Sequence, residues 1–440
     1  MKTRIVLALA ALASACSSTP GLNDGGSGGG SASGGGTGGS GGNAAYFISP
    51  MDPGSGTGLS YLAMAVDPAT SKVGVAYFVN KGAPPDGGSM TDFELRYVEW
   101  QSGQLSAPQV IKTVQRTVGV TVAFQANGEP AVAFLGGGND MSAFWLQSDL
   151  EVDYRSGGST WTAQVPVTGS PNVPCGNPVS DNGFVVGLWP ALVFDGTKAY
   201  LAWRDVHNGQ FPQQDWAGSD LKLSEGGPAS WASKCLQVGG NNKQAYGGRI
   251  QMIMANGQPA LVHDQAFGGA DTSGQNVIFM RRKADMQWTT PATLLSIANT
   301  QSGATLAYDA TEGYGIAVVD RSNNQLTYIH STDGTTFTVP DPVYGTGSGG
   351  WFPSLAMDPV NHEPAIAYYV CSPRDGVTES ACLSSEDELR VAQRISGNWR
   401  ETLIDGEGGY LPKLAFFSSG KKVLAYRHPK TGLLKLAVEK

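Results

Sequence analysis

Three aspartates that follow short apolar runs are the residues of this chain best placed for acid–base chemistry. Asp205, Asp264 and Asp320 each end such a run, and Arg204 and Arg321 stand beside two of them. A pair of carboxylates across a cleft can hydrolyse a glycosidic bond. No second motif ties any two of these aspartates together, and aspartate after a strand is also a common turn residue. Enzyme activity is therefore a hypothesis that rests only on the position of these aspartates at the ends of apolar runs.

Aromatic and polar side chains in the longer connections form a second group of candidates. Exposed tryptophan and tyrosine can stack on a sugar or anchor a protein partner. Besides the aspartates and arginines above, the candidate ligand-binding residues are Trp189, His207, Trp216, Tyr246, Arg249, Trp351 and Tyr410. Packing between structural units is the alternative for Trp189, Trp351 and Tyr410, because aromatic side chains are mostly buried.

The sequence offers no pattern that predicts a metal or a cofactor. The five histidines are scattered, and no serine or cysteine nucleophile signature accompanies them. The run at residues 320–324 has the residue types of a calcium loop but matches no known spacing, and a hairpin turn is the simpler interpretation. We therefore expect no metal and no cofactor.

Five cysteines divide into one candidate lipid attachment site and two candidate disulfides. Cys371 and Cys382 flank a single polar excursion, while Cys175 and Cys235 belong to one repeat unit. Zinc binding is the alternative, but no histidine lies at ligand spacing from either pair. We predict the disulfides Cys175–Cys235 and Cys371–Cys382, with Cys16 left for lipid.

The elements that must position these residues are short strands. Residues 351–405 contain four apolar or alternating runs separated by turn residues, which is typical of an up-and-down antiparallel sheet. The second run is apolar on both faces, so neighbouring sheets must cover both of its sides. Weaker copies recur along the chain, with apolar anchor residues at Met64, Val122, Leu192, Met252, Leu306, Leu355 and Leu414.

Seven such units predict an all-β fold, a seven-bladed β-propeller of four-stranded antiparallel blades. The last unit ends one strand early, and residues 45–48 can supply that strand from the start of the domain. Closure of this kind covers two exposed sheet edges. A frayed N-terminal segment beside a three-stranded last blade is the alternative. In a propeller the candidate residues fall on the face where the long connections gather around the central channel.

The first residues predict a targeting signal rather than a part of the fold. Lys2 and Arg4 precede an apolar core, and the run at residues 13–16 ends in Cys16, as in a signal peptide with its cleavage site. This run resembles the bacterial lipobox, whose cysteine is lipidated after cleavage. An ordinary secretory signal with an incidental cysteine is the alternative. Ser17 after it implies, by that family's rule, the outer membrane or cell surface. Several acyl chains would hold the protein firmly on a membrane.

The chain therefore divides into three parts: residues 1–16 as signal peptide and lipobox, residues 17–43 as a flexible tether, and residues 44–440 as the propeller. Glycine, serine and alanine dominate the tether, which spans about 30 Å as a random coil. The net charge is −8, and no long basic run exists to displace phosphate counterions. We therefore expect no nucleic-acid partner.

The unit at residues 353–405 is similar to a repeat common in surface-anchored bacterial β-propellers. The turn at residues 331–337 also resembles the Asp-box of sialidase-type propellers, although it is one residue short. These resemblances imply a fold and an extracytoplasmic setting but carry no catalytic residues. Our first hypothesis is a lipoprotein whose propeller binds an envelope protein or polysaccharide. The second is a carbohydrate-active enzyme or lectin of sialidase-like shape.

Overall fold

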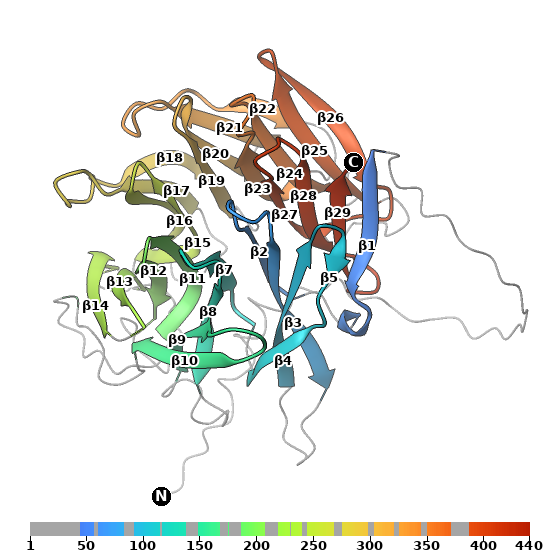
Figure 1. Cartoon of the computed structure of the whole chain (residues 1–440). Coiled ribbons are helices and arrows are strands. Elements are labelled where there is room, and N and C mark those ends of the chain that lie inside the picture. The colour runs from blue at the N-terminus through green and yellow to red at the C-terminus, as the bar shows by residue number, and fades with distance from the viewer. Residues whose placement is uncertain are drawn as a thin grey trace, which may run out of the picture.

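The fold is described from a computed structural model of the chain (Figure 1). The described residues are 45–56, 60–82, 92–114, 117–137, 148–167, 175, 186–206, 219–228, 230–239, 244–267, 275–297, 303–320, 325–344, 350–370 and 387–440. In this part of the chain no helix is long and apolar enough to cross a membrane.

Seven antiparallel sheets follow one another along the chain and form the seven blades (Figure 1). Blade 1 contains β2 (Leu62–Val66), β3 (Val73–Gly82), β4 (Asp92–Gln101), β5 (Gln104–Leu105) and β6 (Gln109–Val114). Blade 2 contains β7 (Val120–Phe124), β8 (Pro130–Gly137), β9 (Ser148–Arg155) and β10 (Trp161–Val167). Blade 3 contains β11 (Val186–Asp195), β12 (Lys198–Asp205), β13 (Asp220–Gly227) and β14 (Ser230–Gln237).

The remaining blades repeat this order. Blade 4 contains β15 (Gln244–Ala255), β16 (Gln258–Phe267), β17 (Gln275–Arg281) and β18 (Ala292–Ile297). Blade 5 contains β19 (Ala304–Asp309), β20 (Gly313–Asp320), β21 (Gln325–Ser331) and β22 (Asp341–Tyr344). Blade 6 contains β23 (Trp351–Met357), β24 (Pro364–Val370), β25 (Glu388–Ile395) and β26 (Asn398–Asp405). Blade 7 contains β27 (Tyr410–Phe416), β28 (Lys422–Arg427), β29 (Leu434–Glu439) and β1 (Tyr46–Asp52).

The first strand of each blade is its inner strand, and the seven inner strands form a closed ring. Each inner strand packs beside the inner strand of the next blade, and β27 of blade 7 packs beside β2 of blade 1. The predicted seven-bladed propeller is therefore confirmed.

The N-terminal strand closes the ring in the way that the sequence predicted. β1 pairs with β29 in antiparallel register, from Tyr46 opposite Glu439 to Asp52 opposite Leu434. A 3-10 turn, η1 (Pro53–Ser55), then leads towards blade 1, and Asp52 caps it by accepting a hydrogen bond from the N–H of Gly54 at 2.8 Å. The alternative of a three-stranded last blade is wrong, because blade 7 has four strands drawn from both ends of the domain.

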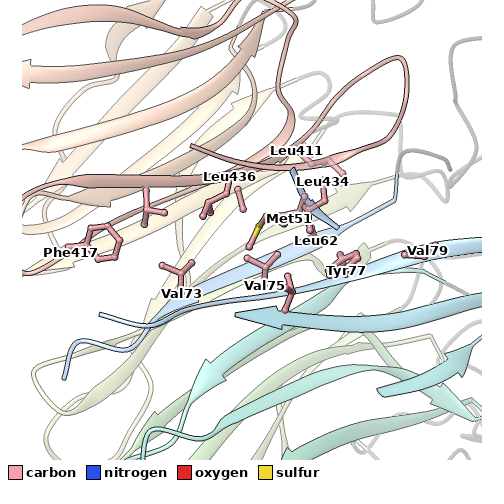
Figure 2. Close-up of a cluster of buried hydrophobic side chains, with 13 residues drawn as sticks. Met51, Leu62, Val73, Val75, Tyr77, Val79, Leu411, Phe417, Leu434 and Leu436 are labelled. Atoms are coloured by element: carbon pink, nitrogen blue, oxygen red, sulfur yellow. The ribbon is translucent and has the colours of Figure 1, made fainter. Parts of the chain in front are cut away.

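Each interface between blades has its own hydrophobic cluster, which explains the alternation of small and large residues in the second strands. In β24, Ala365 and Ala367 face blade 7, while Ile366 and Tyr368 face blade 5. Large side chains of one blade thus fill the space that alanines leave on its neighbour. Figure 2 shows the closing interface, where Leu434 and Leu436 of blade 7 meet side chains of blade 1.

Candidate functional site

All inner strands start at one face of the ring, and all second strands end at that face. In blades 6 and 7 the start of the inner strand lies beside the end of the second strand, with Trp351 opposite Tyr369 and Tyr410 opposite Arg427. The described strand ends that flank the long connections therefore share this face. We call it the bulge face, after the feature described next.

The inner strands of blades 3, 4, 6 and 7 contain a β-bulge just inside the bulge face. Their pairing shifts between Leu188 and Ala191, Gly248 and Gln251, Trp351 and Ser354, and Tyr410 and Lys413. Each shift contains one non-glycine residue with a left-handed backbone, and these residues are Trp189, Arg249, Phe352 and Leu411. Bulges re-aim side chains and are common beside functional sites.

Glycine before the inner strand lets this part of the chain pass close to the preceding blade. Gly350 has a φ of 81°, and a Cβ placed on it would lie 2.8 Å from the Cβ of Leu326 in blade 5. Neither the backbone conformation nor the space suits any other residue. Gly350 is therefore required by the packing of blade 6 against blade 5.

Two of the bulge residues belong to a group of contacting side chains that we call the Trp189 cluster: Tyr61, Trp189, Arg249 and Asp264. The rings of Tyr61 and Trp189 meet edge-to-face with centroids 5.1 Å apart. The Arg249 guanidinium lies 5.7 Å from the Trp189 ring and pairs with Asp264, with Nη1 and Oδ2 3.0 Å apart. Tyr61 precedes β2 of blade 1, and Trp189 is in blade 3, so their contact places the cluster near the ring axis.

The members of the Trp189 cluster differ in exposure. Asp264 is buried, whereas the Arg249 side chain is 25% exposed, and Tyr61 and Trp189 are half-buried. A buried carboxylate thus fixes the orientation of a cation that still reaches solvent, and the cation lies beside an aromatic ring. The cluster can offer a partner two aromatic surfaces and a guanidinium held in place.

A second group, the Tyr410 cluster, lies at the bulge face of blades 6 and 7 and consists of Phe352, Tyr369, Tyr410 and Asp387. The rings of Phe352 and Tyr410 are 4.7 Å apart, and those of Tyr369 and Tyr410 are 5.7 Å apart. The Tyr369 hydroxyl donates to Oδ1 of Asp387 at 2.9 Å. Burial raises the pKa of Asp387 to about 6. Phe352 and Tyr410 are half-buried at this face.

The structure buries several of the predicted binding residues instead of exposing them. Trp351 is fully buried against Tyr369, as in the packing alternative considered for it, and Asp320 is 6% exposed at the end of β20. Arg204 is also buried, and its Nε donates to Oγ of Ser219 at 2.8 Å. None of these three predicted residues reaches the surface of the bulge face.

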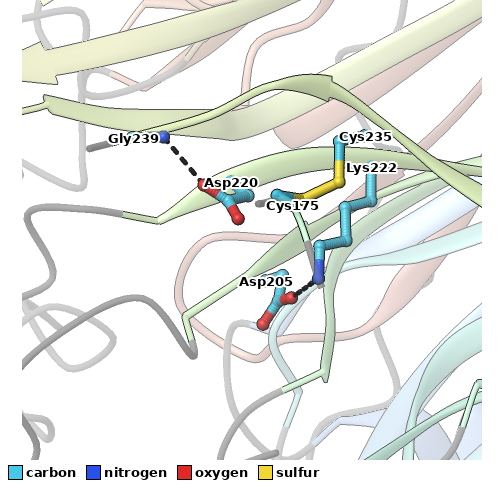
Figure 3. The surroundings of a disulfide bond; sticks show 6 residues. All are labelled: Cys175, Asp205, Asp220, Lys222, Cys235 and Gly239. Carbon is cyan, nitrogen blue, oxygen red and sulfur yellow. Dashed lines mark hydrogen bonds and ion pairs between the residues drawn. A yellow bond between two sulfur atoms is a disulfide. The ribbon is translucent and has the colours of Figure 1, made fainter. Parts of the chain in front are cut away.

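Asp205 and Tyr246, two further predicted binding residues, make contacts within the fold. The Asp205 carboxylate forms an ion pair with Lys222, and both side chains are fully buried (Figure 3). Tyr246 is half-buried beside His263, with ring centroids 6.1 Å apart, and its main-chain N–H donates to the carbonyl of Ser219 at 3.0 Å. Tyr246 therefore joins blades 3 and 4 at the bulge face.

Three predicted ligand-binding residues, His207, Trp216 and Arg321, lie outside the described residues, as do Cys16, Cys371 and Cys382. The disulfide Cys175–Cys235 is present and ties the segment before blade 3 to strand β14 (Figure 3). That prediction is confirmed. Over the ranges that can be described, no three His, Cys, Asp or Glu side chains gather closely enough to hold a metal ion.

Sequence reasoning missed Tyr61, Phe352 and His263. His263 is fully buried, its Nε2 lies 2.5 Å from Oε1 of Gln237, and burial lowers its pKa to about 4. It is therefore a neutral packing residue at neutral pH. Tyr61 stands three residues before its anchor residue, as Trp189 and Phe352 do before theirs, and this spacing could have found it.

The fold and its bulge face define a seven-bladed β-propeller. No protein-family model matches the chain, and a search of the curated proteins finds no match. Among solved structures it is similar to a Hadza microbial sialidase, with a TM-score of 0.48 and 14% identity over 81% of this chain and 74% of that one.

Two further solved structures show a similar arrangement. A mutant NanB sialidase from Streptococcus pneumoniae has a TM-score of 0.46 and 10% identity over 89% of this chain and 71% of that one. A puromycin-hydrolyzing peptidase of Mycobacterium tuberculosis has a TM-score of 0.47 and 13% identity over 87% of this chain and 54% of that one. Similarities at this level describe a distant likeness of fold and transfer no activity.

Proposed function

We propose that this protein is a lipid-anchored β-propeller at the outer membrane or cell surface that binds an envelope protein or polysaccharide through its bulge face. The observation that carries the proposal is the Trp189 cluster, in which side chains from blades 1, 3 and 4 meet near the ring axis and remain partly exposed. Residues far apart in the sequence are thereby assembled on a rigid support.

The composition of this cluster suits recognition. Tryptophan, tyrosine and arginine are the residues that most often dominate binding energy at interfaces. Aromatic rings also stack on sugar faces, and the ion pair of Arg249 with Asp264 at 3.0 Å holds the guanidinium ready for a partner. Phe352 and Tyr410, which like Tyr61 pack against the apolar cluster between blades 7 and 1, add a second aromatic pair at the bulge face.

The route of the N-terminal strand supports the orientation of the site. β28 ends at the bulge face, so β29 starts there and runs to the opposite face, where Glu439 pairs with Tyr46. The chain before Tyr46 therefore joins the ring at the face opposite the Trp189 cluster. A lipid on Cys16 and a tether over residues 17–43 would attach the protein by that opposite face and leave the bulge face open to a partner.

The burial and ion pairing of the candidate carboxylates fit a binding protein better than a hydrolase. A glycosidase needs two carboxyl groups that reach the scissile bond. The Asp205 side chain is fully buried against Lys222, and the Asp264 carboxylate is occupied by Arg249. A carbohydrate-active enzyme or lectin of sialidase-like type is the alternative hypothesis, and of its two forms a lectin would use the same cluster.

A binding screen with matched variants tests this proposal. The purified protein would be applied to a glycan array and used to capture partners from envelope extract, beside Trp189→Ala, Arg249→Gln and the control Arg400→Gln. Arg400 is exposed on β26 and carries the same charge as Arg249. We expect the first two variants to lose binding about 10-fold or more and the control to retain it.

Two results would overturn the proposal. Binding that survives both substitutions in the Trp189 cluster would place the site elsewhere, and release of sugar from an array glycan by the wild type would favour the enzyme. Membrane fractionation tests the anchor separately, because Cys16→Ser should release the protein from the membrane fraction if Cys16 carries lipid.

A further inference from the structure

Inner-strand hydroxyl groups join neighbouring blades near the axis. In blades 2, 5 and 6 the residue before the apolar anchor is Thr121, Thr305 or Ser354, and its hydroxyl oxygen accepts a hydrogen bond from the main-chain N–H of the anchor in the next blade. The donors are Leu192, Leu355 and Leu414, at 3.4, 3.2 and 2.9 Å respectively.

The reason for this bond lies in the position of the inner strand. It is the edge of its sheet, so its outward N–H groups have no strand to pair with and need another acceptor. In each case the hydroxyl residue pairs across the sheet with an alanine, which leaves room beside it: Ala133, Ala317 and Ala367. The repeated geometry defines one acceptor position at each of these three interfaces.

Lys413 occupies the equivalent position in blade 7, at the interface that closes the ring. It precedes the anchor Leu414 and pairs across the sheet with Ala425. Ala425 belongs to the cluster between blades 7 and 1, so Lys413 faces the inner strand of blade 1. An ammonium group can donate hydrogen bonds but cannot accept one. The hydroxyl that serves the anchor at those three interfaces is therefore replaced by a cation opposite Met64.

The Lys413 ammonium has no charged or hydrogen-bonding partner among the described residues. The other cations in the strands of blade 7 are all engaged: Lys422 with Glu439, Lys435 with Asp405, and Arg427 with main-chain carbonyls. The residues of β2 on the facing side are Leu62, Met64 and Val66, which are apolar.

This environment is costly for a charge. Burial lowers the pKa of Lys413 to about 8, so the amine is still mostly protonated at neutral pH. A cation that has lost much of its hydration needs a counter-charge. The side chain is half-buried rather than sealed, so a small solute can reach it.

We propose that a small monovalent anion, either a halide or a carboxylate group, binds at this interface between the ammonium of Lys413 and the main-chain N–H of Met64. The anion supplies the acceptor that Ser354 supplies between blades 6 and 7, and it neutralises the half-buried cation. The site would couple closure of the ring to the anions around the protein, independently of any partner at the bulge face.

The test uses the purified protein and two variants. Lys413→Ser copies the residue of blade 6 at the same register, and Lys413→Met keeps the length of the side chain without its charge. The melting temperature would be measured from 0 to about 200 mM sodium bromide or sodium acetate, with ionic strength held constant by sodium HEPES. We expect a saturable rise of about 2 °C or more in the wild type and none in either variant.

Crystals soaked in bromide give a reading that does not depend on the variants. Anomalous diffraction should place a bromide within hydrogen-bonding distance of the Lys413 nitrogen. In the melting experiment, a rise in melting temperature with bromide but not acetate identifies a halide site. A rise with both salts identifies a site that also accepts carboxylates. An equal rise in wild type and Lys413→Ser, or a bromide map with no peak at Lys413, overturns the proposal.

Discussion

The guanidinium of Arg427 in blade 7 donates a hydrogen bond to the main-chain oxygen of Phe78 in blade 1, at 2.5 Å and across 349 residues of sequence. The same side chain donates to the carbonyl oxygens of Ser60 and Gly432 at 2.8 Å each, and it is fully buried. One arginine thus joins the last blade, the segment before blade 1 and the second strand of blade 1. It holds the ring closed at the bulge face.

Replacement of Arg427 by methionine should weaken this closure. The substitution leaves buried carbonyl groups without donors, so we expect a loss of about 3–5 kcal/mol in the free energy of unfolding. Urea unfolding followed by tryptophan fluorescence measures it. Arg400→Met, at an exposed position of β26, is the control and should change stability by less than about 0.5 kcal/mol. Equal effects at the two positions would show that the carbonyl contacts contribute nothing.

The glycine before an inner strand allows the cost of crowding between blades to be measured. Gly350 and Gly397 have φ values of 81° and 82°, so alanine meets nearly the same backbone strain at both. A Cβ on Gly397 has open space around it, whereas one on Gly350 would lie 2.8 Å from Leu326. We expect Gly397→Ala to cost about 1–2 kcal/mol and Gly350→Ala at least about 1 kcal/mol more. Thermal melts of the two variants check this, and indistinguishable melts would refute the packing role of Gly350.

The strands and the ring could be predicted from the sequence because each depends on local patterns. In β24 the run of alternating small and large apolar residues, bounded by turns, indicates a strand covered on both faces wherever it occurs. Closure by β1 was also predictable, since the last blade was one strand short and residues 45–48 were available.

The site was only partly predictable because the bulges depend on long-range pairing. The bulge at Phe352 interrupts the alternation of inward and outward residues, so Trp351 is buried and Phe352 is half-buried at the bulge face. Alternation read from the sequence cannot show this. The contact of Tyr61 with Trp189 exists only because the ring brings blades 1 and 3 together, and no local sequence pattern predicts this contact.

The buried ion pair of Asp205 with Lys222 predicts strongly non-additive effects of substitution. Both side chains are fully buried, so Lys222→Met should cost about 3–5 kcal/mol by leaving the carboxylate without its partner. The double variant Asp205→Leu with Lys222→Met should recover most of that loss, because an apolar pair needs no compensation. A double-mutant cycle from chemical denaturation measures the coupling.

An exposed pair provides the comparison for that cycle. Lys283 and Asp285 lie 3.1 Å apart with side chains 44% and 59% exposed, and solvent screening should make their coupling much weaker than that of the buried pair. If Lys222→Met and the double variant prove equally unstable, the loss comes from packing around Trp203 and the disulfide rather than from the uncompensated charge.

Asp153 in blade 2 gives the protein a predicted dependence of stability on pH. Burial, and next the neighbouring Glu151 carboxylate, raise the pKa of Asp153 to about 7, although Lys112 acts in the opposite direction. Between its unfolded pKa of about 4 and pH 7 the folded protein binds more protons at this site than the unfolded chain does. The contribution of Asp153 to stability therefore falls as the pH rises through this window.

Asp153→Asn should remove that loss, because the amide stays neutral and can still donate a hydrogen bond to Glu151. We expect the variant to equal the wild type near pH 4 and to exceed it by about 2–4 kcal/mol at pH 8. The comparison must be made as a difference between the two proteins, because His263 also makes stability depend on pH. Burial lowers its pKa to about 4, so its contribution to the free energy of unfolding falls as the pH drops below 6.5. Because the substitution leaves His263 in place, its contribution cancels in the difference. A difference that stays constant from pH 4 to pH 8 would mean that Asp153 is ionised in the folded protein throughout, and that Lys112 outweighs the burial.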